Sequence, residues 1–112
     1  MADRDEFSAG IDAVLDVLRE HGDALTALRE IDHFAYFLDE TSRARFVTEC
    51  EGAGFRLRAL SPPHKEGAGY GAILFHKDVP DEDVLLKITA LLADFARSCG
   101  GDYDGWETRV VT

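Results

Sequence analysis

The chain is poor in cysteine and has no long hydrophobic run. Two cysteines occur in 112 residues, whereas a secreted domain of this size usually carries a denser disulfide framework. The longest apolar run is Phe34–Leu38, which is far shorter than the roughly 20 residues of a membrane-spanning helix. Residues 1–6 are mostly charged and lack the apolar core of a signal peptide. These absences predict a cytoplasmic protein with reduced thiols and no membrane association.

Basic residues are also scarce. The chain has 12 Lys+Arg against 22 Asp+Glu, and its formal net charge at pH 7 is -10. A surface of this sign repels phosphate groups, which argues against direct binding to nucleic acid or to an anionic membrane. The hydrophobic residues, 46% of the chain, are typical of a folded globular protein. The length fits a single domain, residues 1–112.

The N-terminal third begins with a helical pattern. Ser8 is a suitable N-cap, and Gly22 is a suitable stop. Apolar residues recur between them at three- and four-residue spacing: Ile11, Val14, Leu15 and Leu18. We expect residues 1–7 to be disordered, 8–22 to be helical and 23–30 to form an extended connector. A continuation of the helix through 23–30 is the alternative.

The rest of the chain reads as strand, helix, strand, strand, helix, strand. The predicted strands are 31–38, 55–59, 70–77 and 106–111, and the predicted helices begin at Asp39 and at the acidic residues 81–83. This order predicts an α+β fold of the ferredoxin-like split βαβ type (βαββαβ). Residues 31–112 would then form a four-stranded antiparallel sheet with two helices on one face and the extra N-terminal helix outside this core.

The second face of the predicted sheet also needs a cover, because strand 31–38 is largely apolar on both sides. The N-terminal helix and another subunit are the two alternatives, so a homodimer is possible. Four aromatic residues are candidates for this face: Phe34, Tyr36, Tyr70 and Trp106. RNA-binding sheets stack bases on such rings, but the net charge of -10 favours packing under the helix or in a dimer interface.

No set of residues predicts catalysis, a metal or a cofactor. Four histidines are spread along the chain without a metal-binding spacing: His21, His33, His64 and His76. His33 and His76 lie on neighbouring predicted strands and can converge, but two ligands are too few for zinc. Cys50 and Cys99 lie on apolar helix faces, where thiols are inert. The glycine-rich residues 67–71 lack the Lys-Ser/Thr of a phosphate-binding loop.

Two segments give the chain a family resemblance. GDYDGW at 101–106, after a helix that ends in glycine, resembles the C-terminal signature of the regulator of ribonuclease E activity B family. Residues 29–37 (REIDHFAYF), followed by 53–55, are similar to that family's first strand and second helix end. The resemblance covers about residues 11–111. The family commonly continues its signature with Gly-Thr, whereas this chain has Glu107-Thr108.

The resemblance marks five residues as candidate partner-binding or family-motif positions: His33, Tyr103, Asp104, Gly105 and Trp106. A structural role is favoured for the last four, as a turn that starts the final strand. Asp104 can accept hydrogen bonds from backbone amides two residues on. Gly105 can adopt a positive φ, and Trp106 can bury a large ring.

The family implies a non-enzymatic protein that binds the endoribonuclease ribonuclease E and lowers its activity on RNA. The acidic clusters of the chain, such as residues 78–83, are either solvated faces or contacts for a basic partner surface. The alternative function, from another class, is a small regulatory or ligand-binding domain that dimerises through its sheet.

Overall fold

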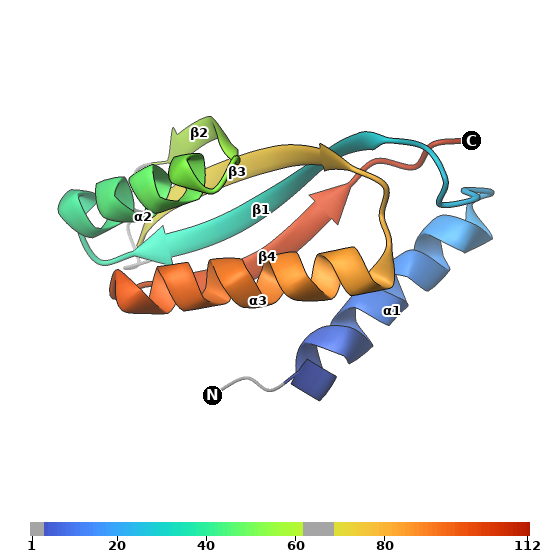
Figure 1. Ribbon diagram of the computed structural model, residues 1–112, viewed down its shortest axis with the longest axis horizontal. Coiled ribbons are helices and arrows are strands. Elements are labelled where there is room, and N and C mark those ends of the chain that lie inside the picture. The colour runs from blue at the N-terminus through green and yellow to red at the C-terminus, as the bar shows by residue number, and fades with distance from the viewer. Residues whose placement is uncertain (1–3, 62–68) are drawn as a thin grey trace.

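The helices and strands occur in the order predicted from the sequence (Figure 1). The computed structural model describes residues 4–61 and 69–112, with side chains described from residue 10 onward within these ranges. The elements are α1 (Arg4–Glu20), β1 (Arg29–Phe37), α2 (Glu40–Gly52), β2 (Arg56–Ser61), β3 (Tyr70–Asp78), α3 (Glu82–Ser98) and β4 (Asp102–Thr108). The chain is therefore an α+β protein with an additional N-terminal helix. No helix within the described residues is long and apolar enough to span a membrane.

The four strands form one sheet in the order β2-β3-β1-β4. Every neighbouring pair is antiparallel. The first half of this fold is β1-α2-β2 and the second half is β3-α3-β4. In the sheet, β3 lies between the two strands of the first half, and β1 lies between the two strands of the second half. This interleaving defines the split βαβ arrangement of ferredoxin-like folds, and the predicted fold class is confirmed.

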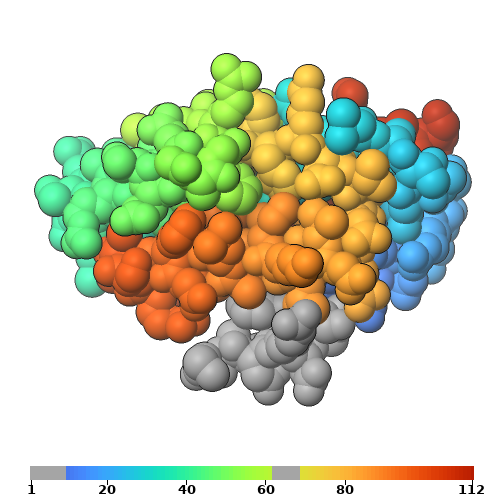
Figure 2. Space-filling model, viewed as in Figure 1, coloured from blue at the N-terminus to red at the C-terminus, as the bar shows by residue number. Residues whose placement is uncertain are grey.

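One face of the sheet is covered by α2 and α3, which lie on the same side (Figures 1 and 2). Alternate residues of β1 point toward these helices and are buried, as the two-residue period of a strand requires. The first core cluster joins the sheet to α2 and α3; its largest members are Phe37, Phe46, Leu74 and Leu92. Asp39 fixes the start of α2, because its side chain accepts a hydrogen bond from the Ser42 backbone N–H at 2.7 Å.

Helix α1 packs on the same side of the sheet, against the N-terminal half of α3. Its buried residues are Ile11, Leu15 and Leu18, which are part of the predicted apolar stripe. They form a second core cluster with Ile31, Leu85 and Leu86, and the Trp106 ring packs against it. Trp106 thus lies under the first helix, as one alternative predicted, but on the helix-covered face rather than on the second face. Tyr70, in register with Phe37, lies on the helix-covered face as well.

The opposite face of the sheet carries no helix among the described residues (Figure 1). The sequence allowed α1 to cover this face, and that alternative is wrong because α1 packs on α3 instead. Phe34 and Tyr36 of β1 lie on this open face, in register with Ile73 and Gly71 of β3, and both aromatic rings are half-buried. The other alternative, cover by another subunit, stays a prediction.

Several boundaries differ from the prediction. Helix α1 begins at Arg4 rather than Ser8, and β1 begins at Arg29 rather than Ile31. Residues 23–28 contain no helix, in agreement with the predicted connector and against its helical alternative. β4 spans Asp102–Thr108 rather than 106–111, so most of the family signature lies within a strand rather than in a turn before it. The strand tolerates the glycine there because its pairing with β1 shifts register between Phe34 and Ala35, as in a β-bulge.

Candidate functional site

A chain of hydrogen bonds crosses the helix-facing side of the sheet through His33. The His33 side chain is almost fully buried, with 2% of the residue exposed. Its Nδ1 lies 2.8 Å from the Tyr103 hydroxyl, and its Nε2 lies 2.9 Å from Nε2 of His76. On the far side, His76 Nδ1 is 3.9 Å from an Asp78 carboxylate oxygen. The predicted convergence of His33 and His76 is confirmed.

The two imidazole rings in this series of hydrogen bonds are neutral. Burial, with a smaller contribution from His76, lowers the pKa of His33 to about 3. Burial also lowers the pKa of His76, against the opposing effect of Asp78, and it raises the pKa of the Tyr103 hydroxyl. A contact between two imidazole nitrogens needs one donor and one acceptor, which neutral rings provide. The arrangement can therefore stabilise a packed core.

The two thiols are also in environments that make them unreactive. Burial raises the pKa of the Cys50 thiol to about 12, and Cys99 is likewise buried and free of a disulfide. Among the residues that the structure describes, no three His, Cys, Asp or Glu side chains are arranged to hold a metal ion. His64 and part of the glycine-rich segment 67–71 lie outside the described residues.

The structure separates the family-motif residues into buried and exposed positions. His33 and Tyr103 are joined by their hydrogen bond, and Trp106 packs against the second core cluster. Gly105 has a φ of 118°, which favours glycine, and Asp104 is exposed at the sheet edge. A partner can therefore reach Asp104 directly, whereas the other side chains shape the strand that presents it. Their role in partner binding stays a prediction.

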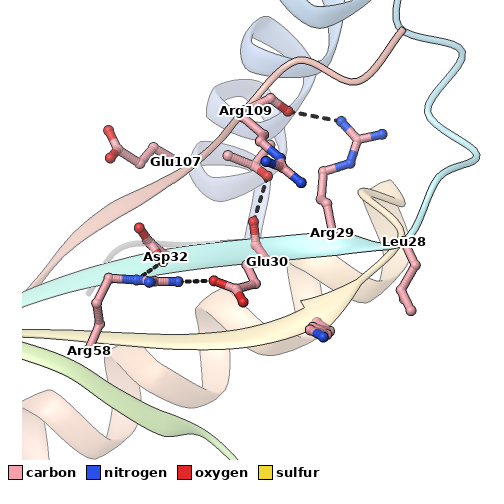
Figure 3. Close-up of a pocket in the computed structure, with 9 residues that line it drawn as sticks. Leu28, Arg29, Glu30, Asp32, Arg58, Glu107 and Arg109 are labelled. Atoms are coloured by element: carbon pink, nitrogen blue, oxygen red, sulfur yellow. Dashed lines mark hydrogen bonds and ion pairs between the residues drawn. The ribbon is translucent and has the colours of Figure 1, made fainter.

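A groove lies on the open face of the sheet (Figure 3). It has a volume of about 700 Å³, and four of its charged lining residues come from different strands: Glu30, Arg58, Lys77 and Glu107. Leu28, Arg29, Asp32, Thr108 and Arg109 complete the lining. Sequence reasoning did not identify these residues. The signal was present in the alternation of β1, which places Glu30 and Asp32 on the face opposite the core.

Arg58 is the central cation of this groove. Its guanidinium crosses β3 to reach β1, where it pairs with Glu30 and donates to Asp32 Oδ1 at 2.8 Å (Figure 3). The guanidinium carbon also lies 4.2 Å from the centre of the Phe75 ring, a cation–π geometry. The hydrogen bond from Arg58 lowers the pKa of Glu30. β2 itself is mostly exposed, and its register with β3 shifts between Leu57 and Ala59.

A buried ion pair supports one end of the groove. Arg29 pairs with Asp23 through its two terminal guanidinium nitrogens, Nη1 and Nη2, and both side chains are almost fully buried. The hydrogen bond from Arg29 is the main reason that the pKa of Asp23 lies below its usual range. Arg29 also donates to the Arg109 carbonyl at 3.1 Å, and Asp23 accepts from the Val111 backbone N–H at 3.0 Å. The pair therefore ties the start of β1 to the segment after β4.

Comparison with known proteins identifies one family. The model of the family described as regulator of ribonuclease activity B matches residues 11–108. No curated protein gives a significant match to the chain. The family match covers α1 from Ile11 onward and all four strands, including the two segments on which the resemblance was based. The protein therefore belongs to the regulator of ribonuclease activity B family.

Proposed function

We propose that this protein is not an enzyme and that it lowers the activity of a cytoplasmic ribonuclease E-type endoribonuclease by binding to it directly. Membership of a family of ribonuclease regulators is the observation that carries this proposal. The chemistry of the described residues supports a binding role, because the thiols are buried and His33 is neutral and enclosed. A regulator without reacting groups must act by occupying a surface of its target.

The outer side of α1 is suited to a basic target surface. Asp12, Asp16 and Glu20 recur every four residues along this helix, and all three are exposed. Residues at this spacing lie on the same side of an α-helix. Within the stripe, only Asp16 pairs with a described cation, Arg19. An exposed pair of this kind contributes little energy and is easily exchanged for a partner's charge.

A ribonuclease must hold RNA through cationic side chains, because the phosphate backbone dominates such binding. An acidic helix that occupies part of this cationic surface competes with RNA and lowers the rate of cleavage. The net charge of -10 also increases the rate of association with a positively charged partner. Inhibition of this kind weakens as salt is added, since both the steering and the contact are screened.

The test combines binding and cleavage measurements with the purified ribonuclease from the same cell. The chain should bind at low salt and slow the cleavage of a single-stranded RNA. Substituting the α1 stripe, Asp12→Asn with Asp16→Asn and Glu20→Gln, should weaken both effects about tenfold or more, as loss of several complementary charges does.

The matched control removes the same charge from α2. Glu40, Glu49 and Glu51 are also exposed acids on a helix, and their replacement by glutamine should leave inhibition close to that of the unchanged chain. Absence of binding at low salt would overturn the proposed function. If both triple variants lost the same amount of inhibition, direct binding would still hold, but α1 would not be the main contact.

A further inference from the structure

The open face of the sheet has an ordered distribution of charge. Three of its cations lie on the β2–β3 half, Arg56, Arg58 and Lys77, and a fourth, Arg109, follows β4. Its anions lie on the β1–β4 half: Glu30, Asp32, Asp102 and Glu107. Between the two halves, Phe34 of β1 and Ile73 of β3 are directly paired across the strands. The face is thus positive on one side, apolar in the middle and predominantly negative on the other side.

We propose that two copies of this chain associate face to face through this open surface, with the two-fold axis parallel to the strands. Such a rotation places the β2–β3 half of each copy over the β1–β4 half of the other. A two-fold contact requires a self-complementary surface, and this orientation brings opposite charges together at both sides. An axis across the strands would instead place β2 over β2 and like charges over one another.

The register makes the proposed contact specific. Arg56 pairs with Phe75, Phe75 with Asp32, and Asp32 with Glu107, so these residues form one row across the sheet. Rotation about an axis parallel to the strands keeps each row at its own level, so Arg56 of one copy meets Glu107 of the other. Neither side chain forms an ion pair with another described residue of its own chain. Both are exposed and free to pair.

The apolar middle supplies the contact area. Phe34 and Tyr36 of β1 and Ile73 and Phe75 of β3 are half-buried on this face, and they would be enclosed by a charged rim, as in most protein interfaces. Four strands about 4.8 Å apart and about 25 Å long give roughly 500 Å² per copy, or about 1,000 Å² in total. An area at the lower limit for specific interfaces predicts a dimer that dissociates on dilution.

Other occupants fit this face less well. A nucleic acid would meet four carboxylates on this face, and Arg58 is already paired with two of them, Glu30 and Asp32. The basic surface of a ribonuclease would be repelled by the β2–β3 half. A face-to-face dimer leaves both copies of α1 directed outward, so the dimer contact is independent of the proposed ribonuclease contact.

Sedimentation velocity across a dilution series tests the proposal. The mass should rise from the 12.4 kDa of the monomer toward twice that value as concentration increases. Arg56→Glu and Glu107→Arg should each weaken the dimer about tenfold or more through like-charge contacts. The double variant Arg56→Glu with Glu107→Arg should restore it, because the pair is then reversed rather than broken. Rescue also separates an interface effect from a folding defect.

Two further variants define the geometry. Phe34→Asp should abolish the dimer by placing a charge in the apolar middle, whereas Arg97→Glu on exposed α3 makes the same charge change as Arg56→Glu and should have no effect. A chain that stays monomeric up to about 1 mM, where even weak complexes are half formed, would overturn the proposal. So would a dimer insensitive to Phe34→Asp, since it would use another surface. Binding of a single-stranded oligonucleotide that Phe34→Asp abolishes would also overturn the proposal.

Discussion

At the residue scale, burial keeps His33 neutral. One ring nitrogen contacts Tyr103 and the other contacts His76, and only 2% of the residue is exposed, so a charged ring would lose its hydration. The folded protein therefore holds the ring neutral, with a pKa of about 3 against an ordinary value of 6.5. An unfolded chain has no such constraint and takes up the proton as soon as the pH falls below 6.5.

The first prediction follows from this difference. Because the pKa of His33 is lowered by folding, its contribution to stability is fully present above pH 6.5 and is lost as the pH falls toward 3. The free energy of unfolding should decrease by up to about 1.4 kcal/mol per pH unit in this window. Urea unfolding at a series of pH values measures this slope.

His33→Gln removes the titrating group and should flatten the slope between pH 6.5 and 4.5, even if it lowers stability at pH 7. His21→Gln removes an exposed histidine and serves as the matched control, with no change in slope expected. A slope that is the same in His33→Gln and in the unchanged chain would contradict the assignment.

At the element scale, local patterns predicted the order of the elements, because three- and four-residue spacing and strand alternation are properties of neighbouring residues. The same patterns could not predict what α1 packs on. Ile11, Leu15 and Leu18 define a buried stripe, but they would suit the open sheet face as well as α3. The choice depends on Leu85, Leu86 and Trp106, which are far away in the sequence.

The start of β4 was missed for a different reason. Gly101, Asp102 and Gly105 are turn-forming residues, so they favoured a loop before the strand. In the structure Gly101 is required by close packing, since an added Cβ would collide with the Phe37 ring. Gly105 is required by its positive φ. The groove was missed because Arg58 reaches Glu30 and Asp32 across a third strand, and this geometry has no local signal.

The second prediction concerns the attachment of α1. Leu15→Ala should leave a cavity in the second core cluster and cost about 2–5 kcal/mol. The single tryptophan of the chain, Trp106, packs against this cluster. Its fluorescence emission in the folded protein should therefore shift to the red as the contact with α1 loosens.

Leu92→Ala is the matched control for this measurement. Leu92 is buried in the first core cluster, so its truncation should cost a similar free energy but leave the tryptophan emission of the folded protein unchanged. An equal red shift in both variants would show that α1 and the sheet respond as one unit, against the expectation.

At the scale of the whole molecule, the excess of acid opposes folding. A formal net charge of -10 is distributed over a chain with a radius of gyration of 14.2 Å. Exposed ion pairs such as Arg19–Asp16 and Arg97–Asp94 offset little of the resulting repulsion. The ion pair that matters most for packing, Arg29–Asp23, is buried and is screened less by salt.

The last prediction is that added salt stabilises the monomer at pH 7. The Debye length falls from about 30 Å at 0.01 M to about 8 Å at 0.15 M salt, which screens the repulsion over most of the molecule. The melting temperature of a dilute sample should therefore rise as NaCl is added. Near pH 4.6, the pI of the sequence, the net charge approaches zero and the same addition should have little effect.

A melting temperature that falls with NaCl at pH 7 would mean that local ion pairs outweigh the net repulsion. A rise at pH 7 that disappears near pH 4.6 would show that the acidic surface lowers the stability of the fold. Folding then gives no reason for so much negative charge on the outer side of α1. Attraction of a basic ribonuclease surface does give one, because the repulsion that opposes folding becomes attraction when the partner is positively charged.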